Sequence, residues 1–167
     1  MKIKYKKGNN LYKKTSSLIP GGVQLLSKRP EIFLPDQWPC YFKSAKGSKI
    51  VTYDDVELYD FTNCSVGMCP LGYANSVINN SVIEAIKKGN TTTLNSYLEH
   101  DCAKLLIDIH PWADMVRFTK SGGEAMSVAV RIARTYKKKD KILFCGYHGW
   151  SDWYISANLK NSNKLDQ

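Results

Sequence analysis

Several features that quickly assign a sequence to a functional class are missing from this chain of 167 residues. It has no continuous apolar run long enough for a secretory signal or a transmembrane helix. The five cysteines include no C-x-x-C pair, so no metal site is predicted and the thiols are expected to be reduced. No internal repeat or heptad is visible. These absences together predict a cytoplasmic globular protein.

Acidic residues are scarce as well. Lysines and arginines number 24 against 15 aspartates and glutamates, which gives a net charge of +9. Such a balance can indicate a nucleic-acid or anionic-membrane surface. The basic residues are scattered, however, and the local run Lys137-Lys138-Lys139 closes a predicted helix, where the helix dipole favours positive charge. We therefore predict neither a nucleic-acid nor a membrane partner.

The most informative stretch runs from Met115 to Trp150. Residues 115–119 favour a β-strand and are followed by a turn at 120–123. Residues 124–136 are rich in helix formers, and the apolar run 141–145 is too short for a helix. Two strands joined by one helix form a βαβ unit, whose strands are normally parallel.

The turn before this helix carries the chemistry. Ser121 and Glu124 have the spacing of a reciprocal capping box. Gly122 and Gly123 lack a Cβ, so a ligand can approach the backbone N–H groups at the positive end of the helix dipole, an arrangement that suits a phosphate. The alternative is a helix cap with no ligand, and the turn lacks the lysine of a P-loop and the third glycine of a dinucleotide fingerprint.

A second motif favours the ligand. Gly146-Tyr147-His148-Gly149 directly follows the second predicted strand. Because the carboxyl ends of neighbouring parallel strands face one crevice, the glycine turn and this loop are expected to converge.

These motifs, with others along the chain, resemble the class III aminotransferases, most of all the glutamate-1-semialdehyde aminomutase-like branch. The resemblance is carried by Ser121-Gly122-Gly123-Glu124-Ala125, Arg131-Ile132-Ala133-Arg134, Tyr147-His148-Gly149, Ile19-Pro20-Gly21-Gly22-Val23, Ala45-Lys46-Gly47 and the run from Pro111 to Phe118.

The resemblance implies an α/β protein of the pyridoxal phosphate (PLP)-dependent transferase fold, fold type I, truncated. Residues 1–62 would form an amino-terminal arm and small-subdomain meander. Residues 63–167 would begin the large three-layer α/β/α domain. It further implies a small-molecule amino donor and acceptor, and a homodimer when full length. The lysine that forms the Schiff base in this family would lie beyond residue 167, so no catalytic residue is assigned and this stretch alone is expected to be inactive.

The resemblance also assigns roles to residues of the two motifs. Gly122 and Gly123, with Ser121 nearby, would bind the PLP phosphate, and Tyr147 would lay its ring on the pyridine face. A core tyrosine at a strand end is the alternative for Tyr147. His148 is either a polar neighbour of the cofactor or a structural histidine. Glu124 is either the reciprocal cap, which we prefer, or a group near the substrate.

Substrate contacts are implied for Ser65 and Gly67. The family usually has Ser-Trp-Gly where this chain has Ser65-Val66-Gly67, so a flat aromatic wall is missing and the aminomutase reaction is in doubt. A plain connecting loop remains an alternative for this segment.

The remaining segments give coarser expectations. Helices are predicted over residues 11–19 and 76–88, from Ser96 to about residue 109 and from residue 152, with a proline-containing arm at 27–39 and a meander at 41–62. The apolar faces of the helices at 76–88 and 96–109 are predicted to be core. Two other functional classes stay open: a catalytically inactive homologue that serves as a partner subunit, and a basic binding module.

Overall fold

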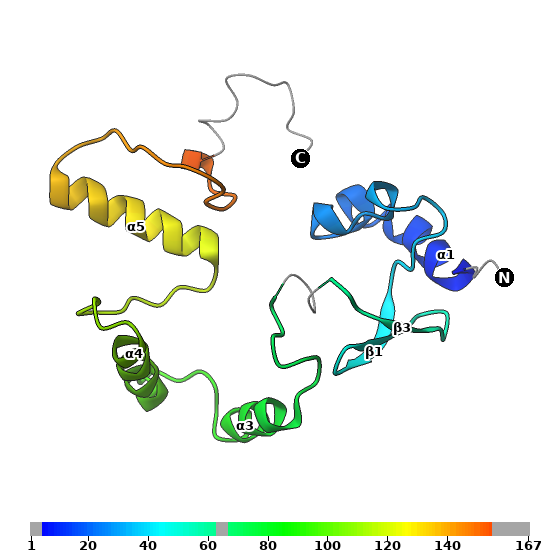
Figure 1. Cartoon of the computed structure of the whole chain (residues 1–167), viewed down its shortest axis with the longest axis horizontal. Coiled ribbons are helices and arrows are strands. Elements are labelled where there is room, and N and C mark those ends of the chain that lie inside the picture. Colours follow the sequence, from blue (N-terminus) through cyan, green and yellow to red (C-terminus); the bar gives the residue numbers. More distant parts are fainter. Residues whose placement is uncertain (1–4, 63–66, 155–167) are drawn as a thin grey trace. The chain divides into compact units, whose positions relative to one another are not determined.

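The structure, a computed structural model, describes residues 5–62 and 67–154. The chain divides into two compact units, Met1–Thr92 and Thr93–Gln167, and each is described by itself. Figure 1 shows the order of the elements along the chain. The predicted division between residues 62 and 63 follows the subdomains of the family and stays a prediction.

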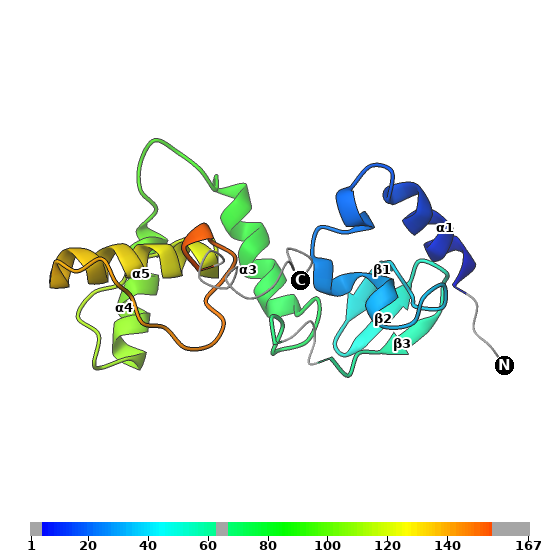
Figure 2. The same cartoon turned by 90° about the horizontal axis from the view of Figure 1, so that it is seen from above.

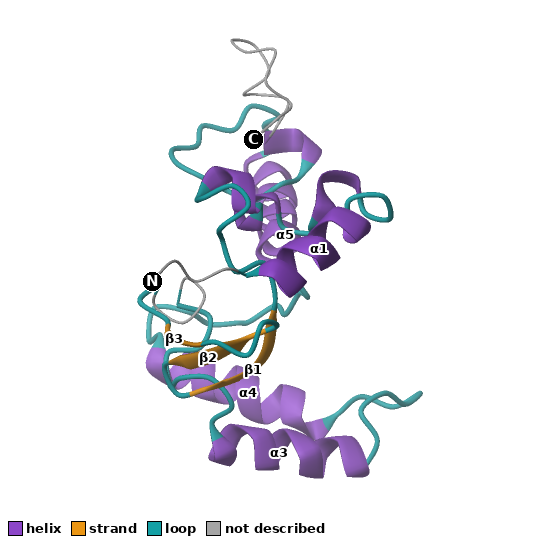
Figure 3. Ribbon diagram, turned by 90° about the vertical axis from the view of Figure 1, so that its right-hand side faces the viewer, coloured by secondary structure: helices purple, strands orange, loops and turns teal. Residues whose placement is uncertain are grey.

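The predicted meander is present in the first unit. It forms an antiparallel sheet of β1 (Phe42–Lys46), β2 (Lys49–Thr52) and β3 (Glu57–Tyr59), in the order β1-β2-β3. Lys46 pairs with Lys49, so Gly47 and Ser48 make the first turn, and the positive φ of Gly47, 57°, suits glycine there. In the described part of the chain the strands of Figure 3 belong to this sheet.

Helix α1 (Lys6–Thr15) begins five residues before the helix predicted at residue 11. Its first turn is capped from the meander, because the Asp54 carboxylate accepts the backbone N–H groups of Lys7 and Gly8 at 2.6 and 2.9 Å. Gly8 is buried, and a Cβ on it would lie 2.9 Å from Asp54 Oδ2. A cap supplied from so far along the chain gives no local sequence signal. It holds α1 beside the sheet (Figure 2).

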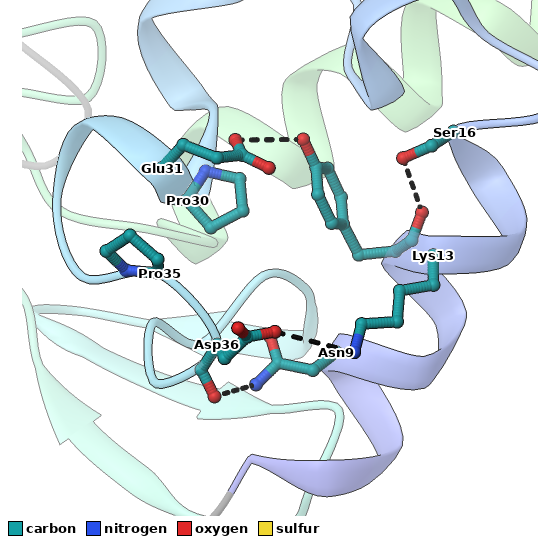
Figure 4. Close-up of a pocket in the computed structure, with 8 residues that line it drawn as sticks. Asn9, Lys13, Ser16, Pro30, Glu31, Pro35 and Asp36 are labelled. Carbon is teal, nitrogen blue, oxygen red and sulfur yellow. Dashed lines mark hydrogen bonds and ion pairs between the residues drawn. The ribbon is translucent and has the colours of Figure 1, made fainter.

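The predicted arm is irregular and contains the short 3-10 turns η1 (Pro20–Gly22), η2 (Leu26–Lys28) and η3 (Pro30–Ile32). Figure 4 shows how it is held to α1 around a cleft of about 300 Å³. The Tyr12 hydroxyl donates to the Glu31 carboxylate at 3.1 Å, and Lys13 forms an ion pair with Asp36 at 3.5 Å. Because these polar groups pair with one another, we interpret the cleft as the packing boundary between α1 and the arm.

A clasp joins the sheet to the segment that follows it. Gly47 and Tyr73 exchange backbone hydrogen bonds of 2.9 and 2.8 Å. The Asp60 carboxylate accepts the backbone N–H of Thr62 at 2.7 Å and also accepts the Tyr73 hydroxyl. Hydrogen bonds from Thr62 and Tyr73 lower the pKa of Asp60. The two ends of the segment between residues 62 and 73 are therefore held by one side chain.

The predicted helices of the middle and end of the chain are confirmed as α3 (Ser76–Lys87), α4 (Tyr97–Ile109) and α5 (Gly122–Lys137). Asn75 caps α3 by accepting from the N–H groups of Val77 and Ile78, and Ser96 caps α4. Residues 152–154 are helical, as expected. None of the helices within residues 5–62 and 67–154 is long and apolar enough to cross a membrane.

The predicted core faces of α3 and α4 are not buried, and this expectation is wrong for the part of the chain that is described. Ile78, Val82 and Ile86 on α3 are 50%, 51% and 57% exposed. Leu98, Leu105 and Ile109 on α4 are exposed to similar degrees. The helical spacing correctly placed each set on one face, but burial requires a second apolar surface, and no described segment supplies one.

The two strands predicted around α5 are also wrong in the described ranges. Residues 115–119 and 141–145 take part in no β-ladder there. A strand is defined by hydrogen bonds to a neighbouring strand, so a β-favouring sequence without a partner stays irregular. The helix of the predicted βαβ unit is therefore confirmed, and its strands are not.

Candidate functional site

The start of α5 is built as the sequence predicted. Ser121 is the N-cap, and its hydroxyl accepts the backbone N–H of Glu124 at 3.3 Å. In return, Glu124 Oε2 accepts the N–H groups of Ser121 at 3.2 Å and of Lys120 at 2.8 Å. The capping box is confirmed, and Glu124 holds the turn by its carboxylate, which was the preferred interpretation of that residue.

The two glycines of the turn present unused donors. Within residues 5–62 and 67–154, the backbone N–H groups of Gly122 and Gly123 make no hydrogen bond, whereas that of Ala125 already bonds to the Ser121 carbonyl. A Cβ on Gly122 would meet no atom within 4 Å. The turn thus has two free donors at the positive end of a helix of 16 residues, with open space beside Gly122. An anionic group such as a phosphate fits this turn.

The loop of residues 146–154 contacts this turn, as the convergence of the two motifs predicted. Gly149 has a φ of 95°, and a Cβ on it would lie 2.9 Å from the Cα of Gly123. The loop can approach the helix this closely because residue 149 is a glycine. A Cβ on Gly123 would lie at an ordinary 3.5 Å from Ser151 Oγ. Gly149 and Ser151 have no role predicted from the sequence, although Gly149 belongs to the Tyr-His-Gly motif.

The two predicted residues of this loop, Tyr147 and His148, differ in their aromatic contacts and in their exposure. Tyr147 is 73% exposed and meets the Tyr154 ring edge-on at a centroid distance of 5.8 Å. His148 is half-buried, with its ring edge-on to Phe144 at 5.8 Å and to Tyr154 at 6.0 Å. The packing of His148 fits the structural alternative, while the exposed Tyr147 has a ring available for a ligand.

The predicted substrate residues, Ser65 and Gly67, belong to another segment of the chain. Gly67 lies in a turn of the first unit and has a φ of 79°. Ser65 lies outside the described residues. The involvement of both in substrate binding stays a prediction.

Comparison with known proteins decides the family. The family model described as aminotransferase class-III matches residues 35–166. The chain belongs to the class III aminotransferases. This class III chain is 36% identical over 157 residues to the 3-aminobutyryl-CoA aminotransferase of Cloacimonas acidaminovorans, covering 93% of the chain and 37% of that protein. It is 40% identical over 150 residues to the glutamate-1-semialdehyde 2,1-aminomutase of Fusobacterium nucleatum, covering 89% of the chain and 34% of that protein.

The solved structures give the fold of this class III chain. It superimposes on a transaminase with PLP bound with a TM-score of 0.78 and 28% identity, covering 90% of the chain and 34% of that structure. The predicted fold, an α/β part of the fold type I PLP-dependent transferases, is confirmed. The chain spans about a third of the length of the curated relatives that it matches. The family and its PLP-bound neighbours imply PLP as the cofactor.

Proposed function

We propose that the start of α5 and the loop 146–154 form the phosphate-binding side of a PLP site in an aminotransferase or aminomutase. One observation carries this proposal: Gly122 and Gly123 have free backbone N–H groups at the start of a long helix, beside open space. Membership of a PLP-dependent family supplies the identity of the anion.

Each residue of the site has a distinct role in this proposal. The N–H groups of Gly122 and Gly123 donate to the phosphate, and the helix dipole favours its negative charge. Ser121 and Glu124 keep the turn in shape through the capping box, which leaves the two glycine donors pointing away from the helix. Tyr147 offers its exposed ring to the pyridine face. A role of His148 as a polar neighbour of the cofactor stays a prediction, because its packing against Phe144 fits a structural histidine.

The reaction class follows from the cofactor. PLP, when bound, acts as the electron sink through which an amino group leaves a donor and joins an acceptor. We infer small amino and keto or aldehyde compounds as substrates, because the relatives are named for such reactions. Ser65 and Gly67 are proposed to contact the substrate. A homodimer, which the family resemblance implies, and a cytoplasmic location, which the cysteine pattern of the sequence predicts, complete the proposal.

The test is PLP binding by the protein expressed from its complete reading frame, with Gly122→Val as the decisive variant. A β-branched side chain at Gly122 enters open space, so the fold accommodates it while the approach of a phosphate to the turn is blocked. We expect PLP affinity to fall at least about a hundredfold, since the charge-assisted hydrogen bonds to the two N–H groups are lost together.

Ser76→Val is the matched control. Ser76 is the first residue of α3, as Gly122 is the first residue of α5, so both variants place a valine at the same helical position. We expect Ser76→Val to bind PLP as the parent does, with similar melting curves for both variants in the absence of PLP. A Gly122→Val protein that binds PLP as tightly as the parent would place the phosphate elsewhere.

A further inference from the structure

A hydrogen-bonded group outside the proposed cofactor contacts joins the loop 146–154 to α5. The Trp153 indole N–H donates to Ser127 Oγ at 3.3 Å, and Ser127 Oγ lies 3.1 Å from Ser151 Oγ. The hydroxyls of Ser127 and Ser151 lie 3.0 and 3.3 Å from the Gly123 carbonyl oxygen. One arrangement uses each proton once: Trp153 donates to Ser127, Ser127 to Ser151, and Ser151 to the Gly123 carbonyl.

The group ends on a residue of the phosphate turn. Gly123 receives the last hydrogen bond on its carbonyl oxygen and is one of the two residues with a free N–H. The same residue contacts Gly149. Movement of Trp153 or Ser151 would therefore act directly on the turn.

The other end of the group reaches Tyr147. The Trp153 ring contacts the Tyr154 ring at a centroid distance of 5.9 Å, and the Tyr154 ring contacts the Tyr147 ring at 5.8 Å. The Tyr154 hydroxyl donates to the Gly146 carbonyl at 3.1 Å, which holds the residue before Tyr147. Among the contacts of the described residues, Tyr147 has none with α5, so its ring is linked to the turn by this route and by the contact of Gly149 with Gly123.

We propose that Ser127, Ser151 and Trp153 are positioning residues, which fix the Tyr147 loop relative to the N–H donors of Gly122 and Gly123. This inference rests on the proposed PLP site. In that site, the N–H donors of the turn and the ring of Tyr147 bind the same rigid ligand. A displacement of one relative to the other therefore weakens PLP binding. None of the three side chains needs to touch the cofactor.

The experiment uses the protein expressed from its complete reading frame and the variants Ser127→Ala, Trp153→Phe and the double variant. Trp153→Phe keeps an aromatic ring and removes the N–H donor, whereas Ser127→Ala removes its acceptor. Ser81→Ala is the matched control, because Ser81 Oγ on the exposed surface of α3 lies 3.0 Å from the carbonyl oxygen four residues earlier, that of Val77, as Ser127 Oγ lies 3.0 Å from that of Gly123.

The measurements are the dissociation constant of PLP, the induced circular dichroism of bound PLP, and hydrogen exchange of residues 144–154 without cofactor. We expect each single variant to weaken PLP binding about tenfold, to reduce the induced signal and to speed exchange of the loop. The double variant should be little worse than Ser127→Ala, because Ser127→Ala already removes the hydrogen bond that Trp153→Phe removes. Ser81→Ala should match the parent in all three.

Two results would overturn the inference. Unchanged loop exchange in Ser127→Ala and Trp153→Phe would mean that the hydrogen bonds do not hold the loop. Faster exchange with parental PLP affinity and dichroism would mean that the loop is held but does not position the cofactor. Failure of the proposed function looks different, because the parent protein itself would then bind no PLP.

Discussion

The region formed by α1 and the sheet differs from the helices α3, α4 and α5 in how far the side chains are enclosed. In the first region, Thr52 is 2% exposed and Tyr5 8%. Among the described residues of the three helices, Val130 alone is buried, at 7% exposure. Both regions have well-formed elements with caps. The difference shows that local sequence can specify a helix without specifying the surface that covers it.

Hydrogen exchange of the 167-residue chain should show the contrast most strongly. We expect amides of β2 to exchange about a thousandfold more slowly than those of α4, a difference of about 4 kcal/mol in opening free energy. A helix of 13 residues with no buried side chain is marginal in water, whereas β2 is paired on both sides. Mass spectrometry of peptides from β2 and α4 makes the measurement, and equal protection would mean that α4 is covered.

Cysteine reactivity tests the same difference in enclosure at single side chains. Burial raises the pKa of Cys40 to about 11, and its Sγ lies 3.0 Å from Asn9 Oδ1. Because the thiolate is the reactive form, alkylation of Cys40 at neutral pH should be about a hundredfold slower than for an ordinary cysteine. Cys102 and Cys145 are exposed and should react first.

Mass spectrometry after iodoacetamide gives the order of labelling. The folded sheet region disfavours the Cys40 thiolate, so its stability should decline as the pH rises from about 9 toward 11. A Cys40 that is labelled as fast as Cys145 would mean that the contact between α1 and the arm opens readily.

Asp54→Ala should give a smaller effect, confined to the sheet region. Loss of the cap on α1 should lower the unfolding free energy by about 1–2 kcal/mol, because two backbone N–H groups lose their acceptor. Denaturant unfolding followed at Trp38 measures it.

Asp55→Asn is the control beside Asp54. Asp55 is exposed and pairs with Lys43 and Lys7, and the hydrogen bond from Lys43 lowers the pKa of its carboxyl. Its contribution is present at neutral pH and is lost as the pH falls through that lowered pKa. We expect Asp55→Asn to unfold nearly as the parent does, since exposed ion pairs contribute little and asparagine tolerates the positive φ of this residue, 64°. Equal effects of the two substitutions on the unfolding free energy would mean that the Asp54 cap does not stabilise α1.

The same contrast explains how far sequence could predict the structure. The capping box at Ser121 and Glu124 and the meander were predictable because their signals lie within a few residues. The cap of α1 by Asp54 was not, since its two partners are far apart in the sequence. The strand predicted at 141–145 failed for the opposite reason, because its composition is right but a strand also needs a neighbour.

The candidate site divides in the same way. The glycine turn and the Tyr-His-Gly loop were predicted to converge, and Gly149 does lie against Gly123. The hydrogen bonds of Ser127 were not predictable, because a serine inside a helix usually bonds only to its own helix. Its extra partners, Ser151 and Trp153, depend on how the loop returns to the helix.

The clasp of Asp60, Thr62 and Tyr73 allows the segment between its two ends to change in length and sequence. A segment whose two ends are pinned can change in length at a small entropic cost, about 0.6 kcal/mol for each doubling. The segment between these two ends can therefore be exchanged while β1–β3 keep their own hydrogen bonds, provided that Gly72 is retained, because a Cβ there would lie 3.1 Å from the Gly47 Cα. Under the proposed function, a change of amine substrate can be accommodated by substitutions in this segment, while the residues that contact the cofactor stay the same.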